Sequence, residues 1–192
     1  VEDAAQVDVS RGQIGLEGDG LPECRLGLLM VAQPGQQASQ VGMRKRMPRR
    51  ERDAMFAIYA FCRKVDDIAD DGVGTRPERH EKLEAWRYDL DALYEGQAPP
   101  RVNFLAPAVA QFGLRKEDFF TILDGMDMDV TEDIVAPDLP TLDLYCERVA
   151  SAVGRLSIKV FGMDERPGFE LAHHLGRALQ LTNILRDIDE DA

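Results

Sequence analysis

Apolar residues recur at helical spacing along most of the chain beyond residue 42. The first run begins near Met43 or Pro48 and continues through Asp70, and a second extends from Pro77 to about Tyr94. Apolar side chains at every third or fourth position place one face of a helix against a core. The same spacing predicts further helices at about 102–112, 116–129, 141–162 and 168–191. No alternating strand pattern of useful length occurs, so the predicted fold class is all-α.

Proline and glycine mark the expected ends of these helices. Pro48 suits the first turn of a helix, where its missing N–H is not needed. Gly72 and Gly74 are predicted to end the first helix, and Gly96 the second. Residues 1–42 are rich in Gly, Gln and acidic residues and show no sustained periodicity, which predicts a disordered or irregular segment.

Two helices interrupt their apolar pattern with a polar stripe. Residues one turn apart share a helix face, so side chains spaced by three or four positions line up. In the first helix the stripe comprises Tyr59, Arg63, Asp66 and Asp70. In the last helix it comprises Gln180, Asn183, Asp187 and Asp191. Each stripe contains two aspartates four residues apart.

Two such stripes facing each other would form a cage of oxygen ligands. Mg²⁺ binds a few carboxylates together with substrate phosphates. Carboxylates buried in a core are costly unless they are paired or bound to metal. The pattern therefore favours a Mg²⁺ site that takes a diphosphate ester, and the competing interpretation is two ordinary solvated helix faces.

Composition narrows the classes of function. The chain is 44% hydrophobic and 30% charged, which fits one globular core. Its net charge of −12 argues against a nucleic-acid partner. The longest apolar run near the start, 26–32, is too short for a membrane span, and no signal peptide pattern is present.

The three cysteines show no metal-type spacing and form no even framework, which predicts a reducing, cytoplasmic location. Cys62 and Cys146 fall within apolar helical patterns and are predicted to be small core residues.

The two stripes belong to longer motifs that resemble the squalene/phytoene synthase family, the head-to-head prenyltransferases. The motifs read Tyr59-x-x-x-Arg63-x-x-Asp66-Asp67-x-x-Asp70 and Gln180-x-x-Asn183-x-x-Arg186-Asp187-x-x-Glu190-Asp191. Between them, the segments 124–129 and 145–156 are similar to the same family. The sequences of these motifs are most similar to those of the bacterial members of the family that serve hopanoid pathways.

The resemblance implies a Mg²⁺-dependent condensation of two farnesyl diphosphates to presqualene diphosphate on an isoprenoid-synthase-type helical bundle. Residues 43–192 would be a partial helical prenyltransferase domain. Two alternatives stay open: a phytoene or dehydrosqualene synthase, and a non-catalytic paralogue that binds prenyl lipids or acts in assembly. The oligomeric state is left open.

The resemblance also implies roles for individual residues. Mg²⁺ would be held by Asp66, Asp70, Asn183, Asp187 and Asp191. The residues that would contact or surround the substrate are Tyr59, Arg63, Tyr145, Gln180, Asn183 and Arg186. Of these, Arg63 would bind a diphosphate, and the two tyrosines would stabilise the leaving group or flank the cation.

Other polar residues receive simpler interpretations. His173 and His174 are adjacent and point different ways, so a zinc site is not expected there, and His80 is expected to be solvated. At least two of the aspartates at 124, 127 and 129 are expected at the surface. The basic run 44–50 is interpreted equally as a peripheral contact with anionic headgroups at the inner membrane face, as a diphosphate contact, or as a solvated helix start.

The ends of the sequence differ from the family pattern. A Ser-Phe-Tyr-like segment usually precedes the first helix in the family, whereas this chain reads Ala38-Ser-Gln-Val-Gly42. The second motif is followed only by Ala192. The bundle is therefore expected to be incomplete at its C-terminal end, to expose an apolar groove there and to be marginally stable.

Overall fold

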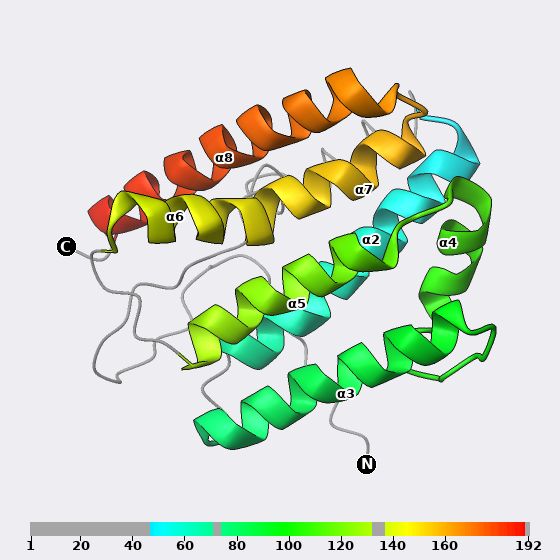
Figure 1. The fold of residues 1–192 in the computed structure, drawn as a ribbon, viewed down its shortest axis with the longest axis horizontal. Helices are drawn as coiled ribbons and strands as arrows, with labels where there is room; N and C mark the ends of the chain where they lie inside the picture. The colour runs from blue at the N-terminus through cyan, green and yellow to red at the C-terminus, as the bar shows by residue number, and fades with distance from the viewer. Residues whose placement is uncertain (1–46, 71–73, 132–136, 191–192) are drawn as a thin grey trace, which may run out of the picture.

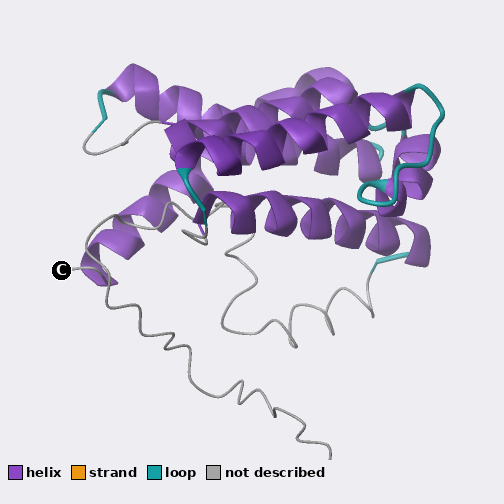
Figure 2. Cartoon of the chain, turned by 90° about the horizontal axis from the view of Figure 1, so that it is seen from below, coloured by secondary structure: helices purple, strands orange, loops and turns teal. Residues whose placement is uncertain are grey.

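The computed structural model describes residues 47–70, 74–131 and 137–190, apart from the side chains of residue 70 and residues 187–190. Within these ranges every regular element is a helix, which confirms the all-α prediction (Figure 2). The elements are α2 (Arg49–Asp70), α3 (Arg76–Tyr94), η2 (Asn103–Leu105), α4 (Ala106–Phe112), α5 (Lys116–Thr131), α6 (Leu139–Cys146), η3 (Glu147–Ser151), α7 (Ala152–Val160) and α8 (Glu165–Glu190).

The long helices alternate in direction across the bundle, as Figure 1 shows. α2, α5 and α8 run one way, whereas α3 and the continuous stretch from α6 to α7 run the other way. The carboxyl ends of α2, α5 and α8 therefore lie at the same end of the molecule as the amino ends of α3 and α6. This shared end holds most of the residues that the sequence motifs single out.

Helix starts follow local chemistry. Thr75 caps α3: its hydroxyl accepts the N–H of Glu78, and the Glu78 carboxylate accepts the N–H of Thr75 at 2.7 Å. This reciprocal pair is a capping box. Pro48 lies one residue before α2, and its carbonyl accepts the N–H of Arg52 at 3.1 Å. It therefore sits at the cap and not in the first turn, one position earlier than predicted.

Helix ends are set by glycine where the backbone turns left-handed. Gly96 follows α3 with φ of +87°, which confirms it as the predicted stop. Gly74, in the link after α2, has φ of +101°. Gly72 and the predicted irregular segment 1–42 lie outside the described residues.

The predicted helix at 141–162 is three elements in one continuous stretch. α6 passes into a five-residue π-helix, η3, and then into α7. The predicted helix at 102–112 likewise begins as the short 3₁₀ turn η2 before α4. Periodicity located both segments but did not reveal the change of helix type.

Aromatic packing joins α2, α3 and α5 in the core. Phe61 meets the edge of Trp86 at 5.6 Å and that of Phe119 at 5.0 Å between ring centroids. Both arrangements are T-shaped, which is favourable for aromatic rings. Cys62 and Cys146 are fully buried, as predicted for small core residues.

Candidate active site

The first polar stripe lies on the C-terminal half of α2. Asp66 is only 4% exposed, although it carries a carboxylate. Arg63 lies one turn earlier, and its guanidinium contacts Asp66 Oδ2 at 3.3 Å and Asp67 Oδ1 at 3.1 Å. The Arg63 side chain itself is 53% exposed. The stripe therefore combines a buried acid with a basic group that still reaches solvent, where it can meet a charged ligand.

Tyr59 lies one turn before Arg63 on the same helix. It is 36% exposed, in contrast to the fully buried apolar residues on the opposite side of α2. A pocket tyrosine was predicted at this position, and that role stays a prediction. The side chain of Asp70, at the end of the stripe, is outside the described part.

The second stripe lies on α8 and is buried in its described part. Gln180 is fully buried and Asn183 is 7% exposed, whereas Arg186 is partly exposed. Among the described residues, Nδ2 of Asn183 has no hydrogen-bond partner. A buried amide atom of this kind is costly unless a ligand or water satisfies it. The side chain of Asp187 and all of Asp191 fall outside the description.

Tyr145 joins the same end of the bundle from α6. It is 1% exposed, and its hydroxyl donates to Asp129 Oδ2 on α5 at 3.1 Å. The hydroxyl is thus oriented by a partly buried carboxylate. The sequence reading placed Tyr145 in the pocket but assigned no partner to it.

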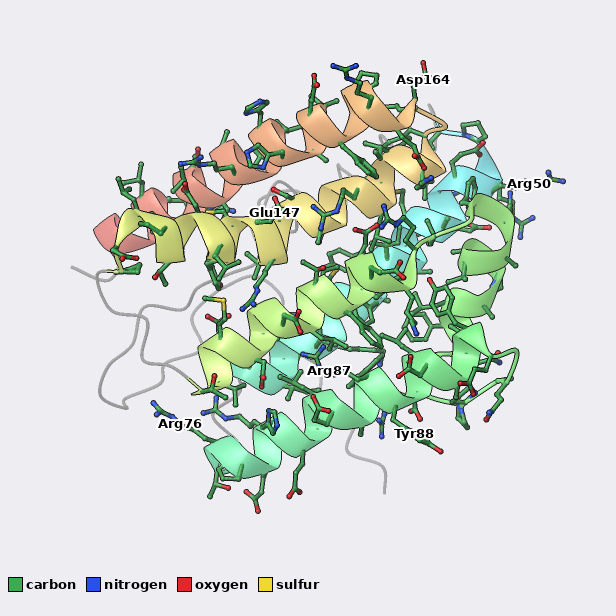
Figure 3. All side chains as sticks on the ribbon, in the orientation of Figure 1. Arg50, Arg76, Arg87, Tyr88, Glu147 and Asp164 are labelled. Carbon is green, nitrogen blue, oxygen red and sulfur yellow. The ribbon has the colours of Figure 1, made fainter. Side chains whose placement is uncertain are left out.

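The aspartates of α5 separate into different environments. Asp124 pairs with Arg87 of α3 at 2.7 Å, in the seam between the two helices (Figure 3). Asp127 bonds Nδ1 of His80 at 2.7 Å. That hydrogen bond and the charge of Asp127 raise the pKa of His80. The His80 side chain is 44% exposed, as expected for a solvated residue, and it has a carboxylate partner that the sequence did not indicate. Asp129 accepts the hydroxyl of Tyr145, a predicted site residue.

Arg79 was missed by the sequence reading. It lies in the first turns of α3, and its Nη1 donates to the carbonyl oxygen of Ala69 in the last turn of α2 at 2.6 Å. No local pattern signals this contact, since it depends on how two consecutive helices meet. It ties α3 to the turn of α2 that contains Asp70.

The donor set fits Mg²⁺ in its described part. Asp66 supplies a buried carboxylate and Asn183 a buried amide, and hard cations prefer oxygen ligands of these kinds. Among the described side chains no cluster of three potential ligands is present. Because the remaining predicted ligands are Asp70, Asp187 and Asp191, the full metal set stays a prediction.

Comparison with known proteins identifies the group. A family model described as squalene/phytoene synthase matches residues 42–192. The chain belongs to the squalene/phytoene synthase family. The matched range agrees closely with the onset of helical periodicity near residue 43, although the division of the chain into two parts stays a prediction.

Relatives within the squalene/phytoene synthase family share high identity with the chain. The presqualene diphosphate synthase of Zymomonas mobilis subsp. mobilis is 62% identical over 152 residues, which cover 79% of this chain and 52% of that protein. The enzyme of the same name from Rhodopseudomonas palustris is 61% identical over 146 residues, covering 76% and 52%. The phytoene synthase of Mycobacterium tuberculosis is 36% identical over 145 residues, covering 76% and 47%. The chain thus spans about half the length of the curated relatives it matches.

Solved structures of squalene/phytoene synthase relatives share the fold. A squalene synthase from Alicyclobacillus acidocaldarius superimposes with a TM-score of 0.71 at 28% identity, covering 88% of this chain and 62% of that one. A dehydrosqualene synthase in complex with a ligand gives a TM-score of 0.61 at 31% identity, covering 79% and 56%. The predicted isoprenoid-synthase-type architecture is therefore confirmed.

Two surface properties complete the description. Within residues 47–70, 74–131 and 137–190, no helix combines the length and apolar character needed to cross a bilayer. α8 carries exposed leucines at positions 171, 175 and 185, with exposed fractions of 46%, 47% and 67%. These leucines are apolar surface, whereas the predicted groove and marginal stability stay predictions.

Proposed function

We propose that the protein condenses two farnesyl diphosphates head to head into presqualene diphosphate, with release of one diphosphate. The choice of product within the family rests on one observation, the difference in sequence identity. Proteins named presqualene diphosphate synthase reach 62% and 61% identity, compared with 36% for the phytoene synthase of Mycobacterium tuberculosis. The buried polar groups of the candidate site are compatible with that chemistry.

Binding of the diphosphates is assigned to the two polar stripes. Asp66, Asp70, Asn183, Asp187 and Asp191 would hold Mg²⁺, which when bound neutralises charge on a departing diphosphate. Asn183 is buried, and its Nδ2 has no partner among the described residues, so this donor suits a diphosphate oxygen while the carbonyl Oδ1 is the atom that would bind the metal.

Arg63 is assigned to direct contact with a diphosphate. A guanidinium presents a planar fork of donors that suits phosphate oxygens. Its present partners, Asp66 and Asp67, orient it along α2, while its 53% exposure leaves donors accessible. Arg63 would thus bind negative charge as the carbon–oxygen bond breaks.

The carbon chemistry requires exclusion of water. Loss of diphosphate from one farnesyl chain leaves an allylic cation, which is attacked by the double bond nearest the diphosphate of the second chain; loss of a proton from the former cationic carbon then closes a cyclopropane ring. Apolar surroundings protect the cation from hydrolysis. Tyr145, buried and oriented by Asp129, is assigned to the wall of this cavity, where a fixed phenol can stabilise positive charge.

Peripheral contact with a membrane is part of the proposal. The amino end of α2 displays Arg50, and the nearby Arg49 side chain is 85% exposed (Figure 3). This end lies opposite the carboxyl end of α2 that contains the aspartates (Figure 1). A basic helix end attracts anionic headgroups, at about 1 kcal/mol per basic residue. Binding to anionic but not to zwitterionic vesicles tests it, and equal binding to both would contradict it.

Product analysis tests the proposed reaction. The full-length protein is incubated with farnesyl diphosphate and Mg²⁺ in the absence of a reductant, and the products are separated by chromatography. Presqualene diphosphate is expected. Phytoene from geranylgeranyl diphosphate would support the alternative synthase, and substrate binding without release of diphosphate would support a non-catalytic paralogue.

A further inference from the structure

A π-helical segment separates the part of the chain that contains Tyr145 from α7. η3 (Glu147–Ser151) begins two residues after Tyr145. A π turn contains one residue more than an α turn, so it rotates the side chains before it relative to those after it. The direction of the Tyr145 side chain therefore depends on the position of this extra residue in the helix.

Two neighbouring helices approach the π-helix closely at glycine residues. A Cβ added at Gly125 of α5 would lie 2.6 Å from Cγ1 of Val149, and one at Gly176 of α8 would lie 2.8 Å from the backbone nitrogen of Ser151. Only a residue without a side chain permits such approaches. The segment is thus held tightly between α5 and α8.

A series of hydrogen-bonded charged side chains links the same segment to α5 and α8. Arg155 of α7 donates from Nε to Oδ1 of the buried Asp118 on α5 at 2.6 Å, and from Nη1 to Oε1 of Glu147. The other carboxylate oxygen of Glu147 shares a hydrogen bond with Nδ1 of His173 on α8 at 3.2 Å. Figure 3 labels Glu147 where the stretch from α6 to α7 passes beside α8. One arginine therefore connects α5 with the first residue of η3.

The contact between Glu147 and Arg155 depends on the inserted residue. The two are eight positions apart. In a regular α-helix, residues eight apart lie about 80° apart around the axis, whereas residues seven apart lie about 20° apart. One extra residue in the intervening turn makes a spacing of eight behave like one of seven. The ion pair therefore forms across the π-helix and favours its register.

α5 contacts the chain both before and after the inserted residue. Asp118 and Asp129 are 11 residues apart (129 − 118), which places them within about 20° on the same face of a helix. Asp118 binds Arg155 after the π-helix, and Asp129 accepts the hydroxyl of Tyr145 before it. A change of register in η3 cannot satisfy both contacts.

We propose that Arg155 is a positioning residue for the reaction: its bridge from Asp118 to Glu147 keeps η3 in the register that sets the Tyr145 hydroxyl against Asp129. Arg155 acts through Tyr145 and does not touch substrate. The catalytic part of this inference rests on the proposed function, whereas the positioning part concerns this chain alone. A purely structural role would change stability without changing the environment of Tyr145.

The first test is spectroscopic and independent of activity. Tyrosine is labelled with ¹³C in the full chain, and the signal of Tyr145 is assigned by its loss in Tyr145→Phe. Arg155→Gln is expected to shift that signal, and Glu147→Gln to shift it in the same direction. Lys159→Gln is the control, because Lys159 lies on α7 like Arg155, and its loss removes only an ion pair with Glu165 of α8 and should leave the signal unchanged.

The second test separates binding from turnover. Arg155→Gln is expected to lower kcat about tenfold with KM for farnesyl diphosphate changed less than about twofold, while Lys159→Gln retains both constants. In a Tyr145→Phe background the same substitution should add little, because the two residues act as one unit. If Arg155→Gln fails to fold, as judged by circular dichroism, Glu147→Gln decides both tests.

The outcomes can be told apart. A Tyr145 signal that is unchanged in a folded Arg155→Gln or Glu147→Gln variant overturns the inference, as does a shifted signal with unaltered kcat. If the wild-type protein does not turn over farnesyl diphosphate, the proposed function fails and the tyrosine signal alone judges the positioning of Tyr145.

Discussion

Nη1 of Arg79 donates a hydrogen bond to the carbonyl oxygen of Ala69 at 2.6 Å. The last carbonyls of a helix lack intrahelical partners, and a cation near them is favourable. α2 has no basic residue of its own in its last turn, so α3 supplies one. The contact supports the turn that places Asp70 one turn beyond Asp66.

Removal of this cap should weaken both the helix end and the metal site. Arg79→Met is expected to destabilise the protein by about 1–2 kcal/mol and to lower its affinity for Mg²⁺ in the presence of diphosphate. Urea unfolding and titration calorimetry measure the two effects. Arg166→Met is the control, because that side chain is 93% exposed and its contact with Glu170 is 3.9 Å long. Equal behaviour of the two variants would contradict the role of Arg79.

Asp66 and Asp67 form a matched pair for testing the metal site. Both contact Arg63, but Asp66 is 4% exposed whereas the Asp67 side chain is 42% exposed. Asp66→Asn is expected to lower kcat by more than about a hundredfold with helicity nearly unchanged. Asp67→Asn should retain most of the activity. Full turnover in Asp66→Asn, measured by release of diphosphate, would remove Asp66 from the site.

The Tyr145 hydroxyl should contribute measurably to stability. Tyr145→Phe removes one side-chain hydrogen bond to Asp129 and is expected to cost about 1 kcal/mol in the free energy of unfolding. Tyr88→Phe removes the same atom from a residue that is 75% exposed and should cost nothing measurable. Chemical denaturation of both variants gives the comparison, and indistinguishable midpoints would mean that the bond to Asp129 is not formed in solution.

Glu147 should make stability depend on acid pH. Burial alone would raise its pKa, but the charge of Arg155 and hydrogen bonds from His173, Arg155 and Ser151 outweigh burial and lower it below 4.5. A lowered pKa contributes stability that is present above the ordinary carboxyl value and is lost as pH falls through the folded value. The stability difference between wild type and Glu147→Gln should therefore shrink on acidification.

Urea unfolding from about pH 7 to about pH 3 checks this expectation. The control is Glu170→Gln, since Glu170 has a side chain that is 69% exposed. Its stability should follow that of the wild type at every pH. A difference for Glu147→Gln that is constant across the whole range would show that the ionisation of Glu147 is not linked to folding.

Local patterns predicted most of the helices, and the reasons for the exceptions are physical. Apolar residues at 145, 149, 153, 156 and 160 keep helical spacing through the π-helix, so an inserted residue leaves no gap in the pattern. Periodicity also indicated that Asp66 and Asn183 lie on core-forming helices, and both are buried. By contrast, the contacts of Arg79 and Asp129 join positions 10 and 16 residues apart in different helices. No motif encodes such pairings, because they depend on how the helices pack.

The T-shaped contact between Phe61 and Trp86 places an intrinsic fluorophore in the core. Trp86 is the single tryptophan among the 192 residues, and it is 5% exposed. Its indole touches α2 through Phe61, while the guanidinium of Arg101 lies 5.8 Å from the ring centre. Its fluorescence therefore comes from one place, the junction of α2 and α3, and not from an average over the molecule. Movement of α2 when a ligand binds near Asp66 can be followed optically in the unlabelled protein.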